Sequence, residues 1–319
     1  MPVGKSAVSP RLTRLVNQRG VNQKFLFPNI TGVQVGTRDG HFMTYDAGAF
    51  LGEAAAPNST EGIRPIKGKY ESFDFGSSKT EFELKEYYAY FKNDVAQGEY
   101  SDGMSIFEKA LPATGKRHDI VRERDLKSVV FSTDNWTNGA MPAAGKFDSN
   151  TSNPVKTIRA RFTQIAKSSA ATDGERWMIM DPLGYDHLRA HAMFTGVVGD
   201  GEITNYATHE MLADAFDVDP SRLLVGKGVY NEERLGETAS NAFIWSDYYL
   251  WMGYMPASVD ESAMTALAYL YLKANEKTVK TGENETGDEH YRWMRATSVG
   301  KYQVGDTAGA YLYTATHSG

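Results

Sequence analysis

The clearest alternation of apolar and polar positions lies in residues 153–167. Asn153 is a suitable helix N-cap, and Pro154 suits the first helical position, where no N–H partner is needed. Four apolar residues then recur at helical spacing and form one stripe: Val155, Ile158, Phe162 and Ile165. The pattern predicts an amphipathic helix that packs on a core through this stripe.

A strand and further helices are predicted downstream. Residues 177–180 are apolar without a break, which predicts a short buried strand, and Asp181-Pro182 turns the chain into another short helix. Thr208 is a suitable N-cap for a helix that buries Met211, Leu212, Ala215 and Phe216. Residues 261–274 are ambiguous, because their Ala, Leu and Met content favours a helix.

Residues 105–131 carry a longer helical pattern with a break. Apolar residues lie on both sides of Pro112, and Gly115 follows closely. Because an internal proline removes a hydrogen bond and crowds the preceding turn, we expect a kink or two helices here. Upstream, residues 81–91 are rich in large apolar side chains, a density more typical of a core than of a binding site: Phe82, Leu84, Tyr87, Tyr88 and Tyr90.

Residues 42–76 have the pattern of a long hairpin. Residues 42–45 begin a strand, residues 70–76 alternate with period two, and residues 48–68 between them hold mostly Gly, Ala, Pro and Ser. That middle part has too few large apolar side chains for a core of its own. Two alternatives stay open, a plain surface hairpin of a monomer or a loop that contacts another subunit. Three basic residues near its tip are candidates for such contacts: Arg64, Lys67 and Lys69.

The first 24 residues are basic, with five Lys or Arg and no acid. One interpretation is a solvated tail. The other is an arm that lies on neighbouring subunits or faces nucleic acid. The candidates for contacts of this arm are Arg11, Arg14 and Arg19.

Composition narrows the classes of protein to which the chain can belong. The 319 residues include no Cys and carry a net charge of −6 at pH 7. Disulfide and thiolate chemistry are therefore excluded, and the negative charge argues against a general nucleic-acid binder. The longest mostly apolar run, residues 264–272, is well short of the ~20 residues that a membrane helix needs. The first residues lack the apolar core of a signal peptide.

The motifs of common active sites are incomplete in this chain. His187 and His191 have the spacing of two metal ligands on a helix, but no Glu follows His187 and no third ligand is evident. Nucleophile-elbow, phosphate-loop and dinucleotide-binding glycine patterns are absent from the sequence. The acids at 214, 217 and 219 lack the spacing of a calcium loop and indicate a helix end and a turn. The acidic residues 232–237 are typical of a solvated face. We therefore predict no catalytic, cofactor-binding or metal-binding residues.

The order of these weak signals resembles one known family. Along the chain come a helix ending in Arg-Glu and an apolar pair (RERDLKSVVF), a Trp, a Pro-started helix (NPVKTIRARF) and a strand, turn and helix that end near His (RWMIMDPLGYDHLRAH). A YN loop and an IW hairpin follow. This order is similar to that of the major capsid proteins of tailed bacteriophages, which have the Hong Kong 97-type fold. The resemblance covers roughly residues 25–313, and the order of motifs carries it.

The resemblance implies an α+β fold with a defined division of the chain. It implies a strand within residues 261–274, and we follow it there. It also implies an arm, an extended loop hairpin, a peripheral domain with a long spine helix, a central α/β axial domain, and closing strands that return to the peripheral domain. The arm with its lead-in segment is expected at residues 1–37, the extended loop hairpin at 38–80 and the peripheral domain at 81–152. The axial domain is expected at residues 153–282 and the closing strands at 283–319.

In function, the resemblance implies a structural protein rather than an enzyme. Its expected role is to assemble pentamers and hexamers of an icosahedral phage head around double-stranded DNA. The expected partners are further copies of the chain, a portal, scaffold or decoration proteins, and DNA through weak non-specific contact; neither a membrane nor a cofactor is expected. The expected location is the virion, after assembly in the cytoplasm of the bacterial host. Two alternatives stay open: an encapsulin-like bacterial compartment shell and a soluble α/β enzyme.

Two activities found in some family members are not transferred to this chain. Some members join subunits by a Lys–Asn isopeptide bond. Lys67 and Lys69 lie in the corresponding loop, but no local pattern identifies the Asn or the catalytic acid. Other members carry a removable N-terminal scaffolding segment. Only about 24 residues precede the lead-in segment here, so a separate scaffold, or none, is expected.

Overall fold

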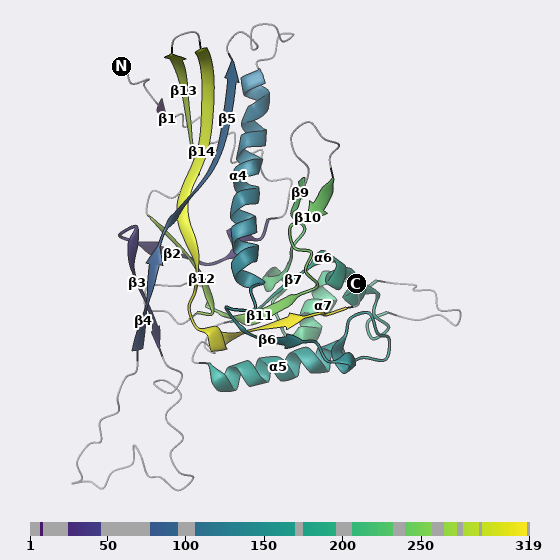
Figure 1. The fold of residues 1–319 in the computed structure, drawn as a ribbon. Helices are drawn as coiled ribbons and strands as arrows, with labels where there is room; N and C mark the ends of the chain where they lie inside the picture. Colours follow the sequence, from purple (N-terminus) through teal and green to yellow (C-terminus); the bar gives the residue numbers. More distant parts are fainter. Residues whose placement is uncertain are drawn as a thin grey trace, which may run out of the picture.

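Two large sheets, two small two-stranded sheets, one long helix and several short helices make up the described part of the chain (Figure 1). The computed structural model describes residues 7–8, 25–45, 77–94, 106–169, 175–195, 206–231, 240–256, 265–272, 277–286 and 289–317. Helix α4 (Ile106–Val130) runs alongside a long twisted sheet, and both end on a second, smaller sheet (Figure 1).

The long sheet is built around β14 (Glu289–Val304), which pairs antiparallel with three other strands. These are β12 (Leu267–Leu272), β13 (Thr278–Thr286) and β5 (Lys85–Asp94). At the edges, β2 (Gly32–Val35) lies parallel to β12, and β1 (Ala7–Val8) lies antiparallel to β13. Residues 267–272 are therefore a strand, as the family resemblance implied.

Helix α4 covers one face of the long sheet. Leu111 packs with Val279, Met294 and Ala296 of that sheet. Pro112 is inside this 25-residue helix, so the alternative of two separate helices is wrong. A proline here lacks the N–H that would bond one carbonyl in the preceding turn. That local cost does not divide the helix, because apolar residues on both sides of Pro112, Leu111 and Leu126, are buried.

The five-stranded sheet has the order β6-β15-β11-β7-β8. Its strands are β6 (Thr137–Ala140), β15 (Ala310–Thr314), β11 (Leu250–Met255), β7 (Glu175–Met180) and β8 (Leu223–Val225). The two closing strands thus separate, because β14 joins the long sheet whereas β15 pairs with β11 and β6 here. Residues 310–314 therefore do not return to the long sheet.

Three helices pack on one face of the five-stranded sheet: α5 (Pro154–Ser168), α6 (Pro182–Ala190) and α7 (His209–Phe216). The two predicted caps are confirmed, because Asn153 accepts from the Lys156 N–H and Thr208 from the Met211 N–H. Asp181 caps α6 in the same way, by accepting from the Gly184 N–H. The apolar stripe of α5 is buried at Ile158, Phe162 and Ile165.

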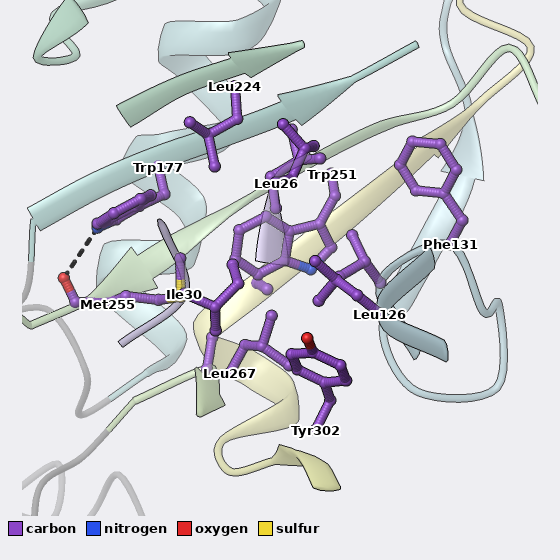
Figure 2. Close-up of a cluster of buried hydrophobic side chains, with 14 of the residues drawn as sticks. Leu26, Ile30, Leu126, Phe131, Trp177, Leu224, Trp251, Met255, Leu267 and Tyr302 are labelled. Atoms are coloured by element: carbon purple, nitrogen blue, oxygen red, sulfur yellow. Dashed lines mark hydrogen bonds between the residues drawn. The ribbon is translucent and has the colours of Figure 1, made fainter. Parts of the chain in front are cut away.

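Strand β7 divides its side chains between two clusters, because successive residues of a strand point to opposite faces. Met178 and Met180 contact the helices. Trp177 and Ile179 enter the central cluster, which also contains Trp251 from β11, Leu126 from α4 and Tyr302 from β14 (Figure 2). The central cluster therefore joins α4 and both sheets. Eight large side chains of the two clusters are buried: Phe162, Trp177, Ile179, Leu188, Leu212, Phe216, Leu224 and Trp245.

Several finer predictions need correction. Met211 is 49% exposed, and Ala213 takes its place on the buried side of α7. Tyr88 and Tyr90 are 60% and 46% exposed, although their density indicated a core. The helix end and turn predicted for the acids at 214–219 are confirmed: Asp217 ends α7 in a left-handed conformation (φ 59°), and Asp219 caps the next turn.

The remaining elements are short. Strands β3 (Asp39–Tyr45) and β4 (Ser77–Glu83) form one two-stranded sheet, and β9 (Val229–Asn231) and β10 (Asn241–Phe243) form another. Single 3₁₀ turns are η2 (Phe27–Asn29), η3 (Ala143–Gly145), η5 (Pro220–Arg222) and η6 (Thr307–Gly309).

Candidate functional site

The root of the predicted long hairpin is a regular two-stranded ladder that projects from the body (Figure 1). Its register runs from Asp39 opposite Glu83 to Tyr45 opposite Ser77. Phe82 and Leu84 hold the root on the body, because they are buried in a cluster with β2 and β12 residues. The candidates Arg64, Lys67 and Lys69 lie outside the described residues, as do Arg11, Arg14 and Arg19.

The face of the long sheet opposite α4 carries exposed aromatic residues, which we call the outer-sheet surface. On β5, Tyr87 and Ala89 are buried, whereas Tyr88 and Tyr90 point the other way and are exposed. The Tyr90 ring stacks on Trp293 of β14, with 6.3 Å between ring centroids. Lys92 lies over the ring of Tyr291 at 3.9 Å. Together these side chains form a surface of aromatic rings with one lysine: Tyr88, Tyr90, Lys92, Tyr291 and Trp293.

A second group of exposed apolar side chains lies on and beside α6 and α7, and we call it the helical surface. Its members are between 44% and 58% exposed: Leu183, Met193, Tyr206 and Met211. Arg189 of α6 holds the segment that leads into α7, because its Nε donates to the carbonyl of Ala207 at 3.0 Å. The sequence did not identify either surface, because exposure depends on which strand or helix faces are covered.

A buried polar cluster between α4 and the long sheet has the atom order of a catalytic triad. Ser298 Oγ lies 2.9 Å from His118 Nε2, and His118 Nδ1 lies 3.3 Å from Asp119. Burial lowers the pKa of His118, which favours the neutral ring. A neutral ring that donates from Nδ1 to Asp119 accepts the Ser298 hydroxyl proton at Nε2, which is how such a triad begins.

The surroundings of this cluster make it structural. His118 has no exposed surface and Ser298 only 3%, so a substrate cannot reach the serine. Lys277 of the Lys277–Asp119 pair binds both carboxylate oxygens and the carbonyl of Gly115, all at 2.9 Å. Residues of β14 and of the segment that starts β13 thus hold α4 in place through hydrogen bonds and charge.

The two histidines with metal-ligand spacing have separate environments. His191 Nε2 lies 2.9 Å from the carbonyl oxygen of Ser149, and Nδ1 accepts from the Met193 N–H at 3.1 Å. Both ring nitrogens of His191 are thus used within the protein. His187 instead packs against the ring of His317. In the described part of the chain, no group of three or more His, Cys, Asp or Glu side chains is placed to hold a metal ion.

Comparison with known proteins identifies the architecture. No family model and no curated protein matches the chain. A phage-related protein from Bordetella bronchiseptica RB50 has a similar structure, with a TM-score of 0.68 and 13% identity over 99% of this chain and 100% of that chain. The capsid protein of the cyanophage P-SCSP1u matches with a TM-score of 0.54 and 8% identity, over 92% of this chain and 88% of that chain. The chain has the Hong Kong 97-type capsid fold.

The capsid fold is shared with a virus-like particle from Pyrococcus furiosus. That match has a TM-score of 0.56 and 11% identity over 95% of this chain and 98% of that chain. The α+β class and the fold predicted from the order of motifs are therefore confirmed. Among the described residues, no helix is long and apolar enough to cross a membrane.

Proposed function

We propose that this protein is the major subunit of an icosahedral phage head, in which pentamers and hexamers enclose double-stranded DNA. The observation that carries the proposal is that a capsid fold accounts for nearly the whole chain, 92% of it in the comparison with the cyanophage capsid. The proposed function is structural, because the most triad-like cluster, around Ser298, is closed to substrates.

The exposed surfaces support assembly with further copies of the chain. Tyr88 and Tyr90 on the outer-sheet surface, and Met193, Tyr206 and Met211 on the helical surface, leave large apolar areas in water. Covering apolar area stabilises a complex by about 25 cal/mol per Å². Stable multi-subunit interfaces bury about 2,000 Å² or more, so we expect both surfaces to be covered by neighbouring subunits.

The other partners and the location follow from this role. A head of this kind needs a portal and, in many cases, scaffold or decoration proteins. Packaged DNA is expected to make only weak, non-specific contacts, because the chain carries a net charge of −6. The expected site of assembly is the cytoplasm of the bacterial host, and the final location is the virion. The arm and the hairpin tip are proposed to contact neighbouring subunits.

An encapsulin-like compartment shell is the second candidate. The similarity to the virus-like particle from Pyrococcus furiosus favours it, because that particle is built on the same fold. The two candidates differ in content, since a phage head encloses DNA and a compartment shell encloses protein cargo.

Electron microscopy and light scattering of the purified protein test both candidates. The expected result is closed shells of uniform size, formed alone or with a co-expressed scaffold. Shells that protect DNA from nuclease after infection or packaging support the phage head, whereas shells that retain one protein cargo support the compartment. A stable monomer at high concentration, with and without scaffold, would contradict both.

A further inference from the structure

The carboxylate of Glu123 joins three distant parts of the chain inside the protein. Glu123 lies in α4 and has no exposed surface. Its oxygens accept from the Leu26 N–H at 2.9 and 3.0 Å and from the Phe27 N–H at 3.0 Å. The indole N–H of Trp245 donates to the same carboxylate at 2.8 Å.

These donors come from two segments that meet on α4. Leu26 is the N-cap of the turn η2 and Phe27 its first residue, and both lie close after the basic segment of residues 1–24. Trp245 belongs to the loop between β10 and β11, and its fully buried ring meets the edge of Phe131 with 4.9 Å between centroids. Glu123 therefore fixes the backbone of Leu26 and Phe27 against α4, next to the ring of Trp245.

Burying a carboxylate between apolar segments costs free energy, because the charged group loses its hydration. Burial raises the pKa of Glu123, against the opposing effect of the Leu26, Phe27 and Trp245 donors. The side chain of the adjacent Arg122 lies over the rings of Phe27 and Tyr269, 4.2 and 4.8 Å from their centroids. Apolar packing alone would hold Phe25 and Leu26 in the central cluster, but only directed acceptors also fix the orientation of the backbone.

We propose that Glu123 is a positioning residue that fixes the backbone of Leu26 and Phe27 against α4, and that regular assembly of the subunits depends on this fixed backbone. The first part concerns the single subunit. The second part, which concerns assembly, rests on the proposed shell function. Because Glu123 binds backbone N–H groups, the contact depends on the path of the chain rather than on the side chains of Leu26 and Phe27.

Glu123→Gln is the main test variant. It keeps the size of the side chain but replaces one acceptor oxygen with an NH₂ group that faces N–H donors. Asp125→Asn is the matched control, because it makes the same change two residues away on α4, where Asp125 accepts from Tyr87 and Lys85. Glu123→Asp keeps the charge but shortens the reach, and it serves if the glutamine variant does not fold.

Hydrogen exchange of dissociated subunits measures the first part of the proposal. We expect the Leu26 and Phe27 amides of Glu123→Gln to exchange about tenfold faster or more, since hydrogen bonds to a charged acceptor are strong. Amide exchange in the C-terminal half of α4 should stay as in the wild type. Asp125→Asn should leave the exchange rates of the Leu26 and Phe27 amides unchanged. Wild-type exchange at both amides in the folded glutamine or aspartate variant would overturn the proposal.

Electron microscopy of the assembled variants measures the second part. We expect Glu123→Gln subunits to give irregular or open particles, and Asp125→Asn subunits to give regular ones. Regular particles from a variant in which the Leu26 and Phe27 amides exchange faster would overturn the role in assembly. If the wild-type protein forms no shells at all, the proposed function fails, while the exchange result still decides whether Glu123 positions the segment.

Discussion

Lys277 binds Asp119 through both carboxylate oxygens, each 2.9 Å from the ammonium nitrogen, and both side chains are about nine-tenths buried. The pair connects the segment that starts β13 to α4. Burial lowers the pKa of Lys277, and the charge of Asp119 opposes that shift. A buried ion pair stabilises a fold only while both charges are present, because either charge alone is buried without a counterion.

Replacing Lys277 with Met should therefore destabilise the subunit by about 3–5 kcal/mol, since Asp119 is left buried without its cation. Urea unfolding of dissociated subunits measures this change. The double substitution Lys277→Met with Asp119→Leu should recover much of the lost stability, because it removes the unpaired charge. A loss below about 1 kcal/mol in the single variant would show that the pair is solvated.

Phe162→Ala should cost about 3–5 kcal/mol, because it leaves a cavity under a fully buried ring that meets Tyr254 edge-on. The expected result is insoluble subunits or a lowered melting temperature, rather than altered particles. Met211→Ala is the control, since Met211 is 49% exposed and its loss should change subunit stability by less than about 0.5 kcal/mol. Normal stability of Phe162→Ala would contradict the packing of α5 on the sheet.

Asp181 and His317 should have opposite effects on stability as the pH falls. Burial raises the pKa of Asp181 from 3.8 to about 6 and lowers the pKa of His317 from 6.5 to about 4. Folded Asp181 holds a proton more readily than unfolded Asp181, so its contribution rises as pH falls from about 6 to 3.8. Folded His317 holds a proton less readily, so its contribution falls between about pH 6.5 and 4.

In the wild type these two contributions largely cancel, and single variants should separate them. Asp181→Asn, which keeps an acceptor for the Gly184 N–H, should lose stability more steeply than the wild type on acidification. His317→Gln should lose it less steeply. Unfolding midpoints at about pH 7 and about pH 4.5 measure the slopes. Equal slopes in all three proteins would contradict the assigned shifts.

Reversing the charges of Arg64, Lys67 and Lys69 to Glu should leave the subunit folded but block or misdirect assembly. The physical reason is that exposed ion pairs, weak singly at about 0–1 kcal/mol, repeat many times in a closed shell. High salt should also weaken assembly intermediates of the wild type, since it screens charges beyond about 8–10 Å. The control reverses three exposed lysines elsewhere, Lys116, Lys156 and Lys167. Normal particles from the tip variant, imaged by electron microscopy, would rule out this role.

Local elements were predictable because their signals lie within a few residues of one another. The Asn153 cap and the spacing of Ile158, Phe162 and Ile165 specify α5 without reference to the rest of the chain. The apolar run of β7 and the Asp181 cap of α6 are equally local. The order of such elements was enough for the capsid fold to be predicted, although no single motif is specific to it.

The tertiary structure decided features that depend on distant partners. Tyr87 and Tyr88 are neighbours of the same residue type, yet only Tyr87 is buried, because α4 covers just one face of the sheet. Pro112 remains inside one helix because contacts with the sheet outweigh its local cost. Glu123 binds groups 97 and 122 residues away in sequence. Residue pattern determines which local elements form, whereas burial and hydrogen bonding between distant segments determine which of their faces are covered and where each polar group finds its partner.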